Sequence, residues 1–97
     1  MIAKMYNWNS WTNECRPDIL MSKYKTMLLD SGFTIRQSLA EFFDPFGFTA
    51  IFLLSESHFA IHTFPEENKT YLELTSCVEP QYKKFLELVA EDDCDGE

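Results

Sequence analysis

The chain has 97 residues, of which 45% are hydrophobic and 15% aromatic. This is enough apolar material for one domain, residues 1–97, and too little for two cores. Sixteen acidic residues against eight basic ones give a formal net charge of −8 and a pI near 4.6. Such acidity argues against nucleic acid and anionic membrane surfaces as partners, because both repel a negatively charged protein. Much of the excess lies in residues 91–97, which we expect to form a solvated acidic tail.

The cysteines, the histidines and the apolar runs of the chain argue against a disulfide framework, a zinc site and a membrane segment. Cys15, Cys77 and Cys94 are widely spaced without a CxxC pair, which favours free thiols in a reducing compartment. Two histidines and three scattered cysteines lack the ligand spacing of a zinc site, so we expect no metal. The chain shows neither a signal-peptide core nor an apolar run long enough to cross a bilayer. We therefore expect a soluble cytoplasmic protein with no membrane partner.

The pattern of apolar residues predicts the element order β-α-β-β-β-β-α. A first helix begins at Pro17, which suits the first helical turn, and ends near Gly32, which suits a helix C-terminus. A second helix begins at Glu79 and Pro80. The expected strands are residues 2–6, 33–43, 48–54, 57–64 and 69–77, with a polar loop over 7–15 and turns at 44–47 and 65–68.

This order predicts the fold class. Consecutive strands joined by short turns favour an antiparallel sheet, and amphipathic helices need an apolar surface to cover. We therefore expect an α+β fold, a two-layer sandwich of a mainly antiparallel sheet with two helices covering one face. The apolar faces of the two helices are predicted to be Ile19, Leu20, Tyr24, Met27 and Leu28 in the first, and Tyr82, Phe85, Leu86 and Val89 in the second.

Both histidines lie close to a serine in the stretch SESHFAIHTFPE, which raises the question of a nucleophile with its base. On a regular strand, however, Ser57 has the opposite parity to His58 and His62, so neither histidine would point towards it. No carboxylate is placed to orient a histidine, which makes a hydrolase triad a weak interpretation. Cys77 ends the following strand, where a hairpin could bring it near Ser57, although a lone strand cysteine is most often a small buried hydrophobe. Spacing alone favours ordinary strand residues.

A longer frame changes this interpretation. Residues 43–66 read FDPFGFTAIFLLSESHFAIHTFPE, and TSC follows at residues 75–77. Without a gap, this frame resembles the processing and active-site region of the prokaryotic S-adenosylmethionine decarboxylase proenzymes. The resemblance covers over a third of the chain, whereas residues 1–42 are similar only in element order. Members of that family usually continue into at least one further strand, where this chain has EDDCDGE.

The resemblance implies an unusual use of serine. In the family, the serine hydroxyl attacks the preceding carbonyl, and the resulting ester is eliminated to leave a pyruvoyl group at the new N-terminus. Carried over to this chain, the peptide bond between Glu56 and Ser57 is cut, giving an upstream chain 1–56 and a downstream chain 57–97. The pyruvoyl group derived from Ser57 then forms a Schiff base with the substrate amine and accepts electrons as carbon dioxide leaves.

The resemblance also implies roles for other residues. His62 matches the histidine that moves a proton during processing, and Cys77 matches the cysteine that returns a proton to the substrate after decarboxylation. Thr49 stands where the family has a serine that assists processing, and its extra methyl group stiffens χ1. Four further residues are expected at the substrate: Phe43 stacked on the adenine ring, Glu66 near the active site, Phe64 in contact with ligand or core, and Asp44 as either a turn residue or a counter-ion for a basic substrate.

Three functions remain open at this point. The first is decarboxylation of S-adenosylmethionine, which supplies aminopropyl groups for spermidine synthesis. The second is the same pyruvoyl chemistry on another small molecule, such as ornithine or arginine. The third is a non-catalytic relative that binds a partner or metabolite, although Ser57, His62 and Cys77 are all present. The family also implies a homodimer of processed chains.

Overall fold

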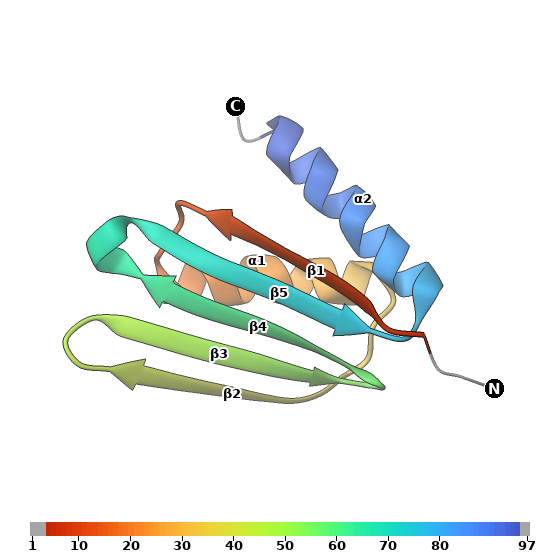
Figure 1. The fold of residues 1–97 in the computed structure, drawn as a ribbon, viewed down its shortest axis with the longest axis horizontal. Helices are drawn as coiled ribbons and strands as arrows, with labels where there is room; N and C mark the ends of the chain where they lie inside the picture. The colour runs from red at the N-terminus through yellow and green to blue at the C-terminus, as the bar shows by residue number, and fades with distance from the viewer. Residues whose placement is uncertain (1–3, 96–97) are drawn as a thin grey trace.

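A five-stranded antiparallel sheet with two helices on one face makes up the fold, as a computed structural model of the chain shows (Figure 1). The structure describes residues 4–95, and the side chains of residues 4–92. The strands lie in the order β1-β5-β4-β3-β2, so the last strand of the chain is inserted beside the first. The predicted α+β sandwich is therefore confirmed. Its elements are β1 Tyr6–Thr12, α1 Pro17–Asp30, β2 Ile35–Phe43, β3 Gly47–Leu54, β4 Ser57–Phe64, the 3₁₀ turn η1 Pro65–Glu67, β5 Lys69–Ser76 and α2 Glu79–Asp95.

The first strand differs from its prediction. The sequence predicted a strand over residues 2–6 and a polar loop after it, but β1 spans Tyr6–Thr12 and pairs with β5 along its whole length. Asn and Ser residues made this stretch resemble a loop, yet they alternate with aromatic side chains. The rings of Trp8 and Phe85 lie 5.2 Å apart, which anchors one face of β1 to α2. Residues 1–3 of the predicted strand lie outside the described residues.

Helix α1 begins and ends where its sequence signals predict. Pro17 occupies the first helical turn, and Gly32 follows the C-cap with φ 98°, a conformation that glycine adopts without steric cost. The amide of Gly32 donates to the carbonyl of Leu29 at 3.0 Å, and that of Phe33 donates to Leu28 at 3.1 Å. This pair of bonds is a Schellman motif, which satisfies the last carbonyls of the helix and directs the chain into β2.

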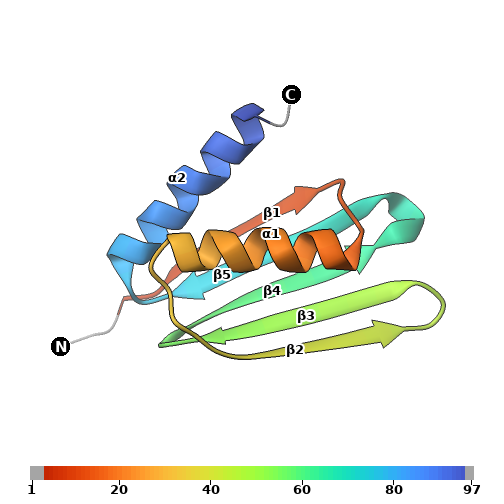
Figure 2. The same cartoon turned by 180° about the vertical axis from the view of Figure 1, so that it is seen from behind.

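The core lies between the helices and the inner face of the sheet. Figure 2 shows α1 lying across β4 and β5, with α2 beside β1. Because side chains alternate along a strand, every second residue of the inner strands is buried against the helices. The fully or almost fully buried apolar side chains there include Leu20 and Leu28 from α1, Phe85 from α2, and Phe52, Leu54, Phe59, Ile61, Leu72 and Leu74 from the sheet.

The opposite face of the sheet carries no helix. On β2 and β3 it exposes Leu39, Ile51 and Leu53, of which Leu39 is 73% exposed. Leu39 and Ile51 are cross-strand partners, so these three side chains form a continuous apolar area, here called the open-face patch. Strand β2 is at the edge of the sheet, and both of its faces are largely exposed. The molecule therefore leaves an apolar area without a covering layer among the described residues.

Part of the predicted acidic tail is helical. Helix α2 continues to Asp95, so within the predicted tail only residues 96 and 97 lie outside the described part of the chain. The Lys23 ammonium lies 2.6 Å from the Asp92 carboxylate. This ion pair links the C-terminal part of α2 to α1 and supports the helical conformation of the acidic residues there. Within residues 4–95, neither helix combines the length and apolar character needed to cross a bilayer.

Candidate active site

The turn between β3 and β4 contains the Glu56–Ser57 peptide bond, which the sequence resemblance predicts to be cut. Two residues, Ser55 and Glu56, join Leu54 to its cross-strand partner Ser57. Glu56 has φ 61°, in the left-handed region that costs a non-glycine residue energy. The amide of Ser55 donates to the carbonyl of Thr34 at 3.1 Å, which anchors the turn to the segment before β2. The Glu56–Ser57 bond therefore lies in a tight turn that is held in place and locally strained.

Ser57 is buried at the start of β4, on the inner face of the sheet. Its hydroxyl donates a 2.7 Å hydrogen bond to Oγ of Ser76, its cross-strand partner on β5. His58, the next residue, is exposed. The geometry thus agrees with the parity argument from the sequence, because Ser57 and the two histidines point to opposite faces of the sheet.

Cys77 contacts the residue on the other side of the same peptide bond. Its Sγ lies 3.5 Å from the carbonyl oxygen of Glu56 and 3.5 Å from Glu56 Oε1, with the thiol as donor. Burial raises the pKa of the Cys77 thiol, and the hydrogen bond and negative charge of Glu56 raise it further. The group is consequently a protonated thiol near neutral pH, suited to donating a proton. Glu56, Ser57 and Cys77 are brought together as the hairpin and the sequence resemblance predicted.

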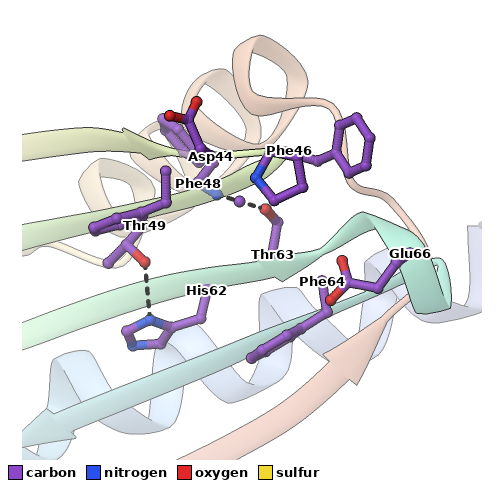
Figure 3. Close-up of a pocket in the computed structure, with 11 residues that line it drawn as sticks. Asp44, Phe46, Phe48, Thr49, His62, Thr63, Phe64 and Glu66 are labelled. Carbon is purple, nitrogen blue, oxygen red and sulfur yellow. Dashed lines mark hydrogen bonds between the residues drawn. The ribbon is translucent and has the colours of Figure 1, made fainter.

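His62 and Thr49 form a second cluster near the other end of β4. They are cross-strand partners, and Thr49 Oγ1 lies 3.2 Å from His62 Nδ1 (Figure 3). Either group can be the donor, depending on which ring nitrogen carries the proton. The ring of Tyr71, from β5, stacks beside the imidazole with the ring centroids 6.2 Å apart. The Thr49 hydroxyl therefore orients the imidazole, although this residue is threonine in place of the serine found in the family.

A pocket of about 550 Å³ adjoins this pair. It lies between the β2–β3 turn and the junction of β4 with η1, and its walls are mostly apolar, with four phenylalanines and two carboxylates among the lining residues (Figure 3). A volume of this size suits a small molecule. Six predicted site residues line it, namely Phe43, Asp44, Thr49, His62, Phe64 and Glu66, together with Pro45, Phe46, Gly47, Phe48 and Thr63.

The structure thus divides the predicted site residues between two ends of one sheet. In Figure 1 the β3–β4 turn and the end of β5 lie at one end, and the β2–β3 turn and η1 lie at the other. His62 is five residues along β4 from Ser57, a separation of about 17 Å at the usual rise of a strand. One chain therefore does not bring His62 or the pocket to Ser57.

Several residues were missed by sequence reasoning. Ser76 contacts Ser57 directly, and its only signal was a parity shared with the buried residues of β5. Phe46 and Phe48 extend the aromatic wall of the pocket, but in the sequence they resemble turn and core residues. Thr63 also lines the pocket, and its Oγ1 accepts a 3.0 Å hydrogen bond from the amide of Phe48, which links β4 to the start of β3. Over the described residues, no cluster of three or more His, Cys, Asp or Glu forms a metal site.

Comparison with known proteins identifies the family of the chain. The family model for S-adenosylmethionine decarboxylase matches residues 13–92, which covers most of the chain and both clusters. The chain belongs to the S-adenosylmethionine decarboxylase family. The resemblance inferred from residues 43–77 is thereby confirmed.

Individual members of the family are similar over shorter stretches. S-adenosylmethionine decarboxylase proenzyme 2 of Bacillus anthracis is 52% identical over 42 residues, which are 40% of this chain and 34% of that protein. The S-adenosylmethionine decarboxylase proenzyme of Archaeoglobus fulgidus is 44% identical over 50 residues, 46% of this chain and 45% of that protein. The alignments therefore span less than half of the length of these relatives.

A solved structure extends the similarity in fold. The crystal structure of the adenosylmethionine decarboxylase from Aquifex aeolicus superimposes with a TM-score of 0.65 at 19% sequence identity. The match covers 86% of this chain and 71% of the other. At this identity the match shows a shared fold, the α+β sandwich described above.

Proposed function

We propose that this chain cuts itself between Glu56 and Ser57 and then decarboxylates S-adenosylmethionine with the pyruvoyl group formed from Ser57. The observation that carries the proposal is the cluster around the β3–β4 turn. Cys77 Sγ lies 3.5 Å from the Glu56 carbonyl oxygen, while the Ser57 hydroxyl is held by a 2.7 Å hydrogen bond. Membership of the family supports it, since the relatives are named as decarboxylase proenzymes.

The acyl shift that begins self-cleavage rearranges only atoms of the turn. The Ser57 Oγ bonds to the carbonyl carbon of Glu56, the carbon–nitrogen bond breaks, and the hydroxyl proton moves to the released amine. Loss of the Ser57 α-proton then breaks the Cβ–Oγ bond, which frees the Glu56 carboxylate and leaves dehydroalanine. Water hydrolyses its imine tautomer, releasing ammonia and leaving a pyruvoyl N-terminus. The left-handed backbone of Glu56 favours this reaction, because breaking the bond relieves its strain.

The residues around Ser57 fit such a group. When formed, the pyruvoyl group supplies the carbonyl that binds the substrate amine and accepts electrons as carbon dioxide leaves. Cys77 stands beside this position as a thiol of raised pKa, so it holds the proton that the substrate carbon needs afterwards. Ser57 is buried on the inner face, which limits access of water.

The pocket supplies the recognition that S-adenosylmethionine requires. Its aromatic rings, Phe43 and Phe64 among them, offer flat apolar surfaces for an adenine ring. Glu66 offers a carboxylate that accepts hydrogen bonds from ribose hydroxyls or pairs with a positive charge. Asp44 adds a second carboxylate at the same pocket, which favours a cationic substrate such as this sulfonium compound.

Two copies of the chain are needed to complete this site. The Ser57 cluster and the His62 pocket are about 17 Å apart on one chain. If two sheets pack through their open faces in opposite directions, the β3–β4 turn of each copy, which carries the Glu56–Ser57 bond, meets the pocket end of the other. In the uncut chain the Ser57 hydroxyl itself points to the inner face of its own sheet. The exposed open-face patch gives an apolar surface for that contact. We therefore propose a homodimer in which His62 and Thr49 of one copy serve Ser57 of its partner.

A direct assay tests the substrate. Purified protein is incubated with carboxyl-labelled S-adenosylmethionine, ornithine or arginine in separate reactions, and released carbon dioxide is counted. The proposal expects release from S-adenosylmethionine that is absent in the Ser57→Ala variant. Release only from ornithine or arginine is consistent with the pyruvoyl chemistry but rejects S-adenosylmethionine as the substrate. In that case, a loss of release in Asp44→Asn identifies Asp44 as the counter-ion of the basic substrate. No release from any of them, by a protein that has cut itself, contradicts decarboxylation of these amino acids.

A further inference from the structure

We propose that Ser76 is the positioning residue for self-cleavage, holding the Ser57 hydroxyl in the orientation from which it attacks the carbonyl carbon of Glu56. The inference rests on the proposed function and assigns a role to a residue outside the expected site. Ser76 is fully buried, and its Oγ accepts the Ser57 hydroxyl at 2.7 Å. This is the one hydrogen bond that the structure gives the Ser57 side chain among the described residues.

The Ser76 oxygen is itself fixed by the backbone. The amide of Val78 donates to Ser76 Oγ at 2.9 Å, across the short connection between β5 and α2. A serine oxygen has two lone pairs, so the amide takes one and leaves the other for Ser57. The carbonyl of Val78 in turn accepts from the amide of Tyr82 in the first turn of α2. The orientation of the Ser57 acceptor is thereby tied to the start of a helix.

The same short connection places a second group. Cys77 lies between Ser76 and Val78, and its thiol contacts the Glu56 carbonyl oxygen at 3.5 Å. Ser76 therefore holds the attacking oxygen on one side of the bond, and Cys77 contacts the carbonyl oxygen on the other. Since β4 and β5 are paired through Ser57 and Ser76, the sheet register sets the distance between these groups. Attack benefits because the nucleophile and its target are aligned before reaction.

Ser76 is a positioning residue and not a base. A neutral hydroxyl oxygen is a weak proton acceptor, and in the acyl shift the proton moves from Ser57 Oγ to the nitrogen that leaves Glu56. What Ser76 contributes is a single direction for the Ser57 O–H bond. Without it, the hydroxyl is free to rotate in a space from which water is largely excluded. The alignment is then lost in most orientations.

The test compares cleavage rates of freshly refolded chains by denaturing mass spectrometry. Ser76→Ala is expected to slow cleavage by between about tenfold and a hundredfold, the range for loss of alignment of a reacting group. Ser76→Thr keeps the hydroxyl and is expected to restore most of the rate. Thr70→Val is the matched control, because Thr70 is also fully buried on β5 and donates a 2.6 Å hydrogen bond, but to the carbonyl of Glu14. Its cleavage rate should equal that of the unchanged chain.

Thermal unfolding monitored by circular dichroism accompanies each variant. If Ser76→Ala does not fold, Ser76→Cys replaces it, because a thiol has nearly the same shape and is a weak acceptor. Equal cleavage rates for a folded Ser76→Ala or Ser76→Cys and the unchanged chain overturn the inference while leaving self-cleavage in place. Failure of the unchanged chain to cleave overturns the proposed function as well.

Hydroxylamine adds a readout that a purely structural role would not change. It cuts an ester but leaves a peptide bond intact, so it reports whether the acyl shift has occurred. In Ser76→Ala we expect no acceleration, because the ester does not accumulate when attack is slow. Restoration of the unchanged chain's rate by hydroxylamine would show that the ester forms normally, which contradicts a role of Ser76 in attack.

Discussion

The thiol of Cys77 lies 3.5 Å from the carbonyl oxygen of Glu56, across the turn that precedes β4. This contact joins the residue that directly follows β5 to a residue twenty-one positions earlier, and it exists because β4 and β5 pair in register at Ser57 and Ser76. It places a protonated sulfur beside the position where the pyruvoyl group would form. The same thiol is then available when the substrate carbon needs a proton.

Replacing Cys77 tests that role directly. Cys77→Ala is expected to lower carbon dioxide release from S-adenosylmethionine by about 10²–10⁴-fold, the usual contribution of a positioned proton donor. The rate is expressed per cleaved chain, so that any change in processing is separated from turnover. Turnover at the unchanged rate would remove Cys77 from the mechanism.

The raised pKa of Cys77 predicts slow alkylation. Thiolate is the reactive form, so a thiol whose pKa lies above its ordinary value reacts with iodoacetamide only at higher pH. In the uncut Ser57→Ala chain, the alkylation midpoint of Cys77 should lie above that of an unfolded cysteine peptide. Adding Glu56→Gln should lower the midpoint, because the negative charge of Glu56 is removed, although the contribution of burial remains.

The sign of this shift also fixes its effect on stability. Because the folded-state pKa of Cys77 is raised, its contribution is present below the ordinary cysteine pKa and is lost as pH rises through the folded value. The uncut chain should therefore lose stability to urea in the alkaline range, and Cys77→Ser should lose less. An equal loss in both chains would show that the thiol is not linked to folding.

The contact between Thr49 and His62 predicts opposite effects of two substitutions. Thr49→Val keeps the shape and removes the hydroxyl 3.2 Å from the imidazole, so cleavage should slow by about tenfold, the value of one lost hydrogen bond. Thr49→Ser keeps the hydroxyl and frees χ1, so cleavage should be as fast or faster. Time courses of the cut fraction measure both. Equal rates for the Val and Ser variants would exclude a role for the hydroxyl.

Mixed dimers test whether the site is shared between two copies. Ser57→Ala and His62→Ala chains are each expected to stay uncut or nearly so when expressed alone. In a mixed dimer, the His62→Ala chain supplies Ser57 and the Ser57→Ala chain supplies His62, so one complete site is regenerated. Mass spectrometry should then find the His62→Ala chain cut and the Ser57→Ala chain intact. If mixing leaves both chains intact, the shared site is wrong.

The end of α1 offers a test of the fold. Gly32→Ala should lower the free energy of unfolding by about 1–2 kcal/mol, because an alanine pays a steric penalty in the left-handed region. Its Cβ would also lie 3.3 Å from Gln81 Cγ. Gly47→Ala is the control, since its Cβ would meet Phe43 at an ordinary 3.5 Å and no positive φ is involved. Urea unfolding of the uncut chain measures both, and equal losses would contradict the backbone explanation.

Local signals in the sequence predicted most of the fold. Pro17 and Gly32 marked the ends of α1, and the start and end of β4 agreed with the predicted residues 57–64. The first strand was misplaced because its burial depends on tertiary contacts, such as Trp8 against Phe85, that no local pattern reveals. The helical part of residues 91–97 was missed for the same reason, since the ion pair of Asp92 reaches Lys23 on another helix.

The site was predictable in composition but not in arrangement. The resemblance named the residues of both clusters, and the hairpin predicted that Cys77 lies near Ser57. The resemblance assigned Ser57 and His62 to one active site and did not reveal that they lie at opposite ends of the sheet, although strand parity had predicted their opposite faces. Ser76 could not be predicted as a site residue, because only the pairing of β4 with β5 brings it into contact with Ser57.

Denaturing mass spectrometry of the purified protein tests the central claim most directly. The account predicts two fragments, residues 1–56 and 57–97, with the downstream fragment blocked at its N-terminus by pyruvate in place of serine. The Ser57→Ala chain, treated identically, should give one intact mass. A single intact mass from the unchanged chain after prolonged incubation would contradict self-cleavage and, with it, the pyruvoyl-dependent activity proposed for this protein.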